Sequence, residues 1–369
     1  MTTRILAAFT LAFCLAAQAG PFQPKHLAVL QAGNGELDLK LKQSPVFIDE
    51  FAPGAFNPQP LSAVAIPTNG PDTIFFNGHA ATEGMLSRSA DGRFLVFAGY
   101  GGVNLLQSGG TPSLLDIGRA FCTVDAEGRV HTVIYGKQGR SGKMNPRGAA
   151  SDGENNFWSC GNALGTAYYN AAGSAAPVNF HDVPNSRAIK IINHTLYVTL
   201  NGADSIVAGQ PPGIYSFTED DEDAPLPRSP DSALKLVVPA KEPYTKIAGF
   251  DLNPAGTIAY VADTADGVQK YVKTNGAWNF AYNFSIPQNI PASENHEAGC
   301  FGLVVDFTGP APIIYATTAE GYNGCANSNR VVQIVDTNAN AVVTTLAQAP
   351  NKQVAYRGID FTPVAAAKP

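Results

Sequence analysis

From residue 20 onward the chain repeats one local pattern: a short apolar run, a turn signal and a second short apolar run. Residues 94–97 follow Asp91 and Gly92 in this way, and residues 258–261 follow Gly256. The 3.6-residue periodicity of amphipathic helices is almost absent. Because short apolar runs bounded by Gly, Pro, Asn and Asp are typical of strands joined by tight turns, the pattern predicts an all-β protein.

A longer motif recurs: a charged residue, a small residue, an alternating strand, a turn and a second apolar strand. Its seven copies begin at Glu83, Arg119, Arg147, Arg187, Lys246, Glu297 and Arg357. The steps between copies scatter around the roughly 40 to 50 residues of propeller blades that carry loop insertions. The sequence therefore predicts a seven-bladed β-propeller. The uneven steps leave a β-sandwich or a β-helix as alternatives.

The last copy, residues 357–361, has no partner strands downstream. Three apolar runs near the N-terminus, residues 26–30, 46–48 and 63–66, are available to complete its blade. A blade built from both ends of the chain closes a propeller ring and hides the sheet edges. We therefore expect the N-terminal strands to join the C-terminal inner strand.

The N-terminus predicts a secretory signal peptide over residues 1–19. Arg4 provides the positive charge, residues 5–17 are apolar, and Ala17 and Ala19 fit the small-x-small cleavage rule. A lipoprotein signal ending at Cys14 is the alternative, and the bulky Phe13 before it disfavours this. We expect a secreted or periplasmic protein whose residues 20–369 form a single propeller domain, without a membrane span.

Four cysteines remain after the predicted cleavage: Cys122, Cys160, Cys300 and Cys325. An even number in an exported chain indicates disulfides, here with the pairings 122–160 and 300–325. Free thiols or a zinc site are the alternatives. No close C-x-x-C pair supports zinc, and we expect neither a metal nor a cofactor.

The charged residues that begin the seven copies are expected to surround one end of the central channel. This ligand-binding set is Glu83, Arg119, Arg147, Arg187, Lys246, Glu297 and Arg357. Arginine binds carboxylate, phosphate or sulfate through two parallel hydrogen bonds. The set therefore predicts binding of an acidic small molecule or glycan, although ion pairs that tie blades together would use the same residues.

Three residues are candidates for acid–base catalysis at the same end. His79 and His296 directly precede predicted inner strands and would act as the general base, and Tyr100 would act as the acid. Such a set suits eliminative cleavage of a uronic-acid glycan. Glu83 with Glu297 would instead suit hydrolysis. These residue types are common, so the reaction stays open.

Several segments together resemble a group of largely uncharacterised secreted bacterial propeller-like proteins, some of which carry C-terminal surface-sorting tails. The resemblance rests on residues 89–95, 98–100, 157–158, 260–263, 269–270, 329–330 and 356–358. It implies a propeller fold and export, and it brings no catalytic residues to transfer. This chain ends in Ala367, Lys368 and Pro369 without a sorting helix.

These observations predict a secreted propeller that binds an acidic ligand, with a glycan as the first choice. A carbohydrate-active enzyme, a lyase ahead of a hydrolase, is the first alternative, and a structural or adhesive scaffold is the second. The formal net charge of -6 argues against a nucleic-acid partner, which requires a basic surface. We expect a monomer.

Overall fold

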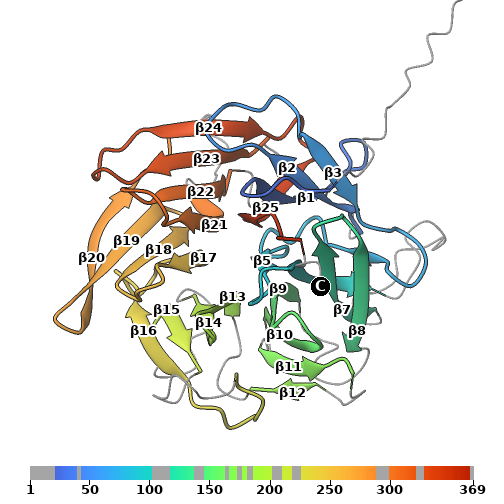
Figure 1. Cartoon of the computed structure of the whole chain (residues 1–369), viewed down its shortest axis with the longest axis horizontal. Helices are drawn as coiled ribbons and strands as arrows, with labels where there is room; N and C mark the ends of the chain where they lie inside the picture. The colour runs from blue at the N-terminus through green and yellow to red at the C-terminus, as the bar shows by residue number, and fades with distance from the viewer. Residues whose placement is uncertain are drawn as a thin grey trace, which may run out of the picture.

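The computed structural model describes residues 21–39, 43–101, 117–136, 145–162, 166–172, 177–180, 186–201, 210–217, 226–287, 299–320 and 328–365. Within these ranges the regular structure is all strand, and no helix is long and apolar enough to cross a membrane. The strands form six antiparallel sheets arranged as blades around a central channel (Figure 1). The predicted all-β class and propeller arrangement are confirmed, and the sandwich and β-helix are excluded.

Blades 1 to 3 follow one another along the chain, and the strands of each are given in order from the channel outward. Blade 1 contains β5 (Ser87–Arg88) and β4 (Ile74–Phe75), both paired with β6 (Phe94–Gly101), then β7 (Gly118–Asp125) and β8 (Val130–Gly136). Blade 2 contains β9 (Pro146–Ser151), β10 (Asn156–Gly161), β11 (Ala167–Asn170) and β12 (Val178–Asn179). Blade 3 contains β13 (Ser186–Ile192), β14 (Thr195–Leu200), β15 (Gly213–Ser216) and β16 (Lys235–Pro239).

Blades 4 to 6 complete the ring. Blade 4 contains β17 (Ile247–Leu252), β18 (Ile258–Asp263), β19 (Gly267–Thr274) and β20 (Ala277–Phe284). Blade 5 contains β21 (Cys300–Asp306), β22 (Ile313–Thr318), β23 (Arg330–Val335) and β24 (Val343–Gln348). Blade 6 contains β25 (Ala355–Phe361), β1 (Leu27–Ala32), β2 (Val46–Phe51) and β3 (Ser62–Ala65).

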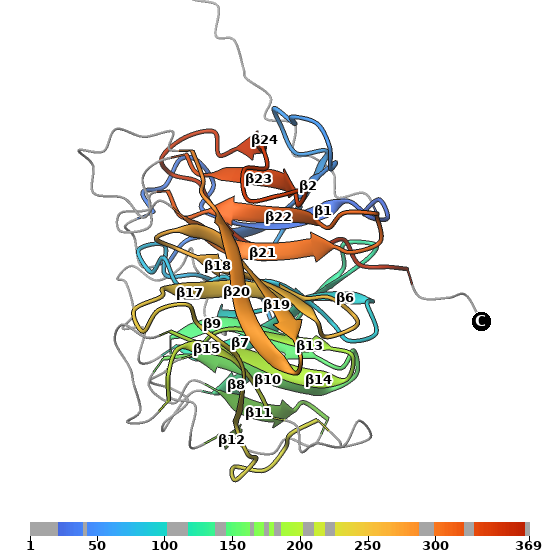
Figure 2. The same cartoon turned by 90° about the vertical axis from the view of Figure 1, so that its left-hand side faces the viewer.

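Blade 6 is built from both ends of the chain, as predicted. Strand β25 pairs with β1 in antiparallel register, with Ile359 opposite Val29 and Asp360 opposite Ala28. The side view in Figure 2 shows the N-terminal β1 and β2 stacked beside the C-terminal strands β22 and β23. Because of this pairing, strands from both ends of the chain are held in one sheet.

The predicted number of seven blades is wrong, and the structure has six. The segment expected to open a second blade, from Arg119, is the middle of β7 and pairs with β6 on one side and β8 on the other. Arg119 lies opposite Tyr100 in this pairing. A buried third strand has the same apolar pattern as an inner strand, so the local sequence could not distinguish them.

The hydrophobic core is divided among the interfaces between neighbouring blades. Five of its clusters each join two adjacent blades, and a sixth joins blades 3 and 4 and also contains Met85 and, from blade 5, Phe301. One contains Trp158 of blade 2 with Leu196 of blade 3, and another contains Tyr260 of blade 4 with Leu303 of blade 5. Burial of such side chains contributes about 1.5–3 kcal/mol each. The ring is therefore held together mainly between its sheets.

The inner strands approach one another too closely for side chains at one level of the channel. A Cβ atom on Gly302 would lie 2.6 Å from the carbonyl oxygen of Arg357, and one on Gly358 would lie 2.1 Å from the backbone nitrogen of Leu86. Gly249 is similarly crowded by the backbone of β21, and Gly148 is crowded by the side chain of Met85, just before β5. Glycine at these positions lets blades 1, 2, 4, 5 and 6 meet at the channel axis.

Both predicted disulfides are wrong, because Cys122, Cys160 and Cys300 are buried free thiols. Cys122 belongs to the core between blades 6 and 1, whereas Cys160 belongs to the core between blades 2 and 3. Side chains held in separate cores cannot approach to bonding distance. Cys325 lies outside the described residues, and Cys300 is free of any bond to it.

Candidate functional site

Three arginines occupy equivalent positions at one end of the channel. A register shift marks a β-bulge near the start of β9, β13 and β25, and Arg147, Arg187 and Arg357 lie at these shifts. Bulges redirect side chains away from the regular up-and-down alternation. Lys246 directly precedes β17 at the same end. We call Arg147, Arg187, Arg357 and Lys246 the arginine mouth.

The contacts of the arginine mouth run to neighbouring blades. Arg147 Nη1 donates to the carbonyl of Ser186 in blade 3 at 2.9 Å, and Arg357 Nη2 donates to the carbonyl of Gly78 at 3.3 Å. Arg187 makes no such bond within the described part of the chain, and its Nε, like the Nε atoms of Arg147 and Arg357, is buried without a hydrogen-bond partner there. Arg147 and Arg357 therefore brace the ring, while Arg187 keeps donor capacity for another molecule.

Glu83 and Arg119 belong to a buried cluster beside this mouth. The Tyr100 hydroxyl donates to Glu83 Oε1 at 2.8 Å, and the Arg119 guanidinium lies 4.7 Å from the centre of the Tyr100 ring. Burial raises the pKa of Glu83 to about 7, against the lowering effect of hydrogen bonds from Tyr100 and Asn77. Burial thus favours the protonated form of this carboxyl.

The catalytic candidates predicted from the sequence differ in their exposure and contacts. The Tyr100 side chain is buried and bonded to Glu83, and burial together with the Glu83 charge raises its pKa, so its proton is poorly placed for a substrate. His79 is exposed and follows Gly78, whose carbonyl binds Arg357. His296 and Glu297 lie outside the described residues. Among the residues that are described, no cluster of His, Cys, Asp or Glu could hold a metal ion.

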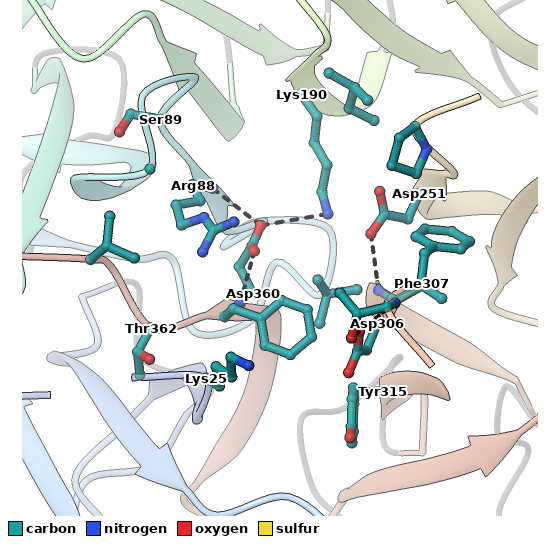
Figure 3. A pocket seen from close by; sticks show the side chains of 18 of the residues that line it. Lys25, Arg88, Ser89, Lys190, Asp251, Asp306, Phe307, Tyr315, Asp360 and Thr362 are labelled. Carbon is teal, nitrogen blue, oxygen red and sulfur yellow. Dashed lines mark hydrogen bonds and ion pairs between the residues drawn. The ribbon is translucent and has the colours of Figure 1, made fainter. Parts of the chain in front are cut away.

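A cavity of about 700 Å³ lies at the opposite end of the channel, where the inner strands end (Figure 3). We call it the distal pocket. Its charged lining includes Arg88 on β5, Lys190 on β13, Asp251 on β17 and Asp360 on β25. We did not predict this pocket from the sequence. The available signal was the repeated run of glycine, an apolar residue and aspartate at residues 249–251 and 358–360.

The two aspartates of this repeated run connect neighbouring inner strands in the same way. Asp251 Oδ2 accepts the backbone N–H of Val305 in blade 5 at 2.9 Å, and Asp360 Oδ2 accepts the N–H of Arg88 in blade 1 at 3.1 Å. Lys190 Nζ lies 3.6 Å from Asp360 Oδ2. Burial raises the pKa of Asp251, Lys190 lowers it and Asp360 raises it.

The comparisons with known proteins support the fold. No protein-family model matches the sequence, and no curated protein matches it. A chain from the crystal structure of a nidogen/laminin complex is similar, with a TM-score of 0.52 and 10% identity, over 91% of this chain and 98% of that chain. The Swd1 β-propeller domain of Myceliophteria thermophila gives a TM-score of 0.44 at 11% identity, over 94% and 100% of the two chains. At such identities the likeness to the nidogen/laminin chain concerns the fold alone.

Proposed function

We propose that this protein is an exported β-propeller that binds an acidic ligand, with an acidic glycan as the first choice, at the arginine mouth. The observation that carries the proposal is the placement of Arg147, Arg187 and Arg357 at equivalent β-bulges around one end of the channel. Lys246 adds a fourth cation there. Convergent positive groups in a concave site attract an anion even when the whole protein is acidic.

Arg187 is the group best suited to meet the ligand. All three arginines have a buried Nε without a hydrogen-bond partner among the described residues, but Arg147 and Arg357 each bind a backbone carbonyl through a terminal nitrogen, and Arg187 makes no such bond there. A guanidinium carries five donors in a fixed fork that matches a carboxylate. Uronic acids carry one carboxylate on each sugar ring, so successive rings would offer a carboxylate to each arginine.

Titration calorimetry with trigalacturonate tests this proposal, with its methyl ester as the neutral control. We expect the wild-type protein to bind the acid and Arg187→Gln to weaken binding at least about tenfold, since one charge-assisted hydrogen bond contributes about 1.5–3 kcal/mol. Arg129→Gln, which removes an exposed arginine from the turn between β7 and β8, is the charge-matched control. Equal binding of acid and ester, or none of either, would reject the proposal.

A lyase is the second candidate function, because the exposed His79 adjoins the carbonyl that binds Arg357. The general acid would then be water or another group, since Tyr100 is buried against Glu83. Absorbance of unsaturated products in the same solutions separates catalysis from binding. Product that disappears in His79→Ala would establish the lyase. Binding without product would identify a recognition protein.

Export depends on the predicted signal peptide, because the described cysteines are free thiols and no longer argue for an oxidising compartment. Expression of the full chain with its own N-terminus, followed by N-terminal sequencing of the product, tests this part. A mature protein that begins at Gly20 supports export. Retention of the first 19 residues in the soluble product would contradict it.

A further inference from the structure

The distal pocket is separate from the arginine mouth, because it lies where the inner strands end and the arginine mouth lies where they begin. Five of the six blades contribute to its lining, which includes Arg88, Lys190, Asp251, Asp306 and Asp360, one residue from each of these blades. Its volume of about 700 Å³ falls within the roughly 300–1,000 Å³ typical of small-molecule sites.

Backbone N–H groups hold the two aspartates of the pocket floor. Asp251 accepts the N–H groups of Val305 and Leu252, at 2.9 and 3.0 Å. Asp360 accepts those of Arg88 and Phe361, at 3.1 and 2.8 Å. Each carboxylate oxygen thus accepts one backbone N–H group, which fixes both aspartates in the pocket floor.

Lys190 completes the floor from across the channel. Its ammonium group donates to the Leu303 carbonyl at 3.1 Å and lies 3.6 Å from Asp360 Oδ2. Both the residue and its carboxylate partner are almost fully buried. The positive charge of Lys190 is therefore committed to the protein itself.

Arg88 is the exception in this pocket. Its backbone N–H binds Asp360, whereas its guanidinium has no acceptor within the described ranges. The side chain is half-buried in the pocket wall, and Figure 3 shows it beside the open volume. Lys25 adds an exposed ammonium group to the lining. Arg88 and Lys25 are therefore cations of the lining without a carboxylate partner among the described residues.

Apolar side chains form the rest of the wall. Ile192, Phe307 and Phe361 are each half-buried and line the cavity, so they are available to cover an apolar body. Asp306 and Asp360 also line the pocket, and their negative charges would repel a second negative group on a ligand. The lining thus favours a single anionic group attached to an apolar body.

We propose that the distal pocket binds an organic monocarboxylate with an aromatic or branched apolar body, its carboxylate held by the guanidinium of Arg88. The apolar body lies against Ile192, Phe307 and Phe361. This ligand differs from that of the arginine mouth in both size and polarity. The two ends of the channel therefore bind independently, one an extended acidic chain and the other a small amphipathic acid.

Titration calorimetry with indole-3-butyrate on the wild-type protein tests the proposal, with its methyl ester and tryptamine as neutral and cationic controls. We expect the carboxylate to bind at least about tenfold more tightly than the ester, and tryptamine not to bind, because only the carboxylate can form a charge-assisted pair with Arg88. No binding of indole-3-butyrate up to millimolar concentration, or equal binding of the ester, would overturn the proposal.

Variants then locate the site. Arg88→Gln should weaken indole-3-butyrate binding about tenfold or more, and Ile192→Trp should reduce it by filling the cavity. Arg129→Gln and Arg187→Gln should leave it unchanged. Loss of binding in Arg187→Gln with full binding in Arg88→Gln would place the ligand at the arginine mouth and overturn the proposal. If Arg88→Gln does not fold, the comparison of indole-3-butyrate with its methyl ester on the wild-type protein still tests the proposal.

Discussion

The ammonium group of Lys190 in blade 3 lies 3.6 Å from Oδ2 of Asp360 in blade 6, across the channel. Strand β25, which carries Asp360, also anchors the N-terminal β1. One ion pair thus connects the middle of the chain with the blade that closes the ring. Because both side chains are largely buried, this pair is poorly screened by solvent.

Removal of the Lys190 charge should destabilise the fold. Lys190→Met leaves Asp360 without its cation and should lower the free energy of unfolding by about 3–5 kcal/mol at pH 7. Burial raises the pKa of Asp251, and the charge of Lys190 lowers it. Loss of that charge in Lys190→Met should therefore raise the pKa of Asp251 further. The loss should therefore be larger at pH 8 than at pH 5.

Urea unfolding at both pH values measures the effect of Lys190→Met. Lys352→Met removes an exposed lysine and serves as the control, with an expected change within about 0.5 kcal/mol. Equal stability of Lys190→Met and wild type at pH 8 would show that the channel pair has no net role.

The buried Glu83 should make stability depend on pH. Its pKa of about 7 lies above the ordinary value of 4.5, so the folded state binds the proton more tightly than the unfolded state. Stability should then fall as pH rises from about 4.5 to about 7, by up to about 3 kcal/mol. In Glu83→Gln the free energy of unfolding should change less with pH over this interval.

Urea unfolding of both proteins between pH 4.5 and 8 measures the contribution of Glu83 as a difference. Asp49, whose pKa burial also raises to about 7, should leave a residual slope in Glu83→Gln. Asp49→Asn with Glu83→Gln should remove most of that slope. If the free energy of unfolding depended on pH in the same way in Glu83→Gln and wild type, Glu83 would be ionised throughout this pH range.

The close approach of the inner strands should make Gly358 intolerant of any side chain. An alanine Cβ there would lie 2.1 Å from the Leu86 nitrogen and 2.7 Å from the Gly84 carbonyl oxygen, and both are backbone atoms. Gly358→Ala should cost about 3 kcal/mol or more. Gly309→Ala, whose Cβ would meet its nearest neighbour at 3.5 Å, should cost less than about 0.5 kcal/mol. Thermal melting of both variants gives the comparison.

The buried thiols should resist alkylation in the folded protein. Burial raises the pKa of Cys160 to about 12, and it raises the pKa values of Cys122 and Cys300 as well, so little thiolate exists at pH 8. Iodoacetamide labelling followed by peptide mapping should modify these three residues only in denaturant. A peptide linking Cys122 to Cys160 without reduction would contradict the structure.

Much of the architecture was predictable because its signals are local. Short apolar runs between glycine-rich turns indicated strands, and the inner strand at 357–361 without downstream partners indicated closure by the N-terminus. The blade count failed at Arg119, because only the pairing of β7 with both β6 and β8 distinguishes a third strand from an inner one. The disulfides failed for a related reason: cysteine spacing does not reveal which core a thiol enters.

The sequence by itself determined the strand pattern and the charged residues near the start of β9, β13 and β25, since these depend on neighbours along the chain. Only the tertiary structure decided that Arg147 and Arg357 brace adjacent blades while the Arg187 guanidinium makes no hydrogen bond with a described residue. Only it brought Arg88, Lys190 and Asp360 together at the distal pocket. These residues come from three blades, so long-range packing sets the distances between them and the extent to which each side chain is shielded from water.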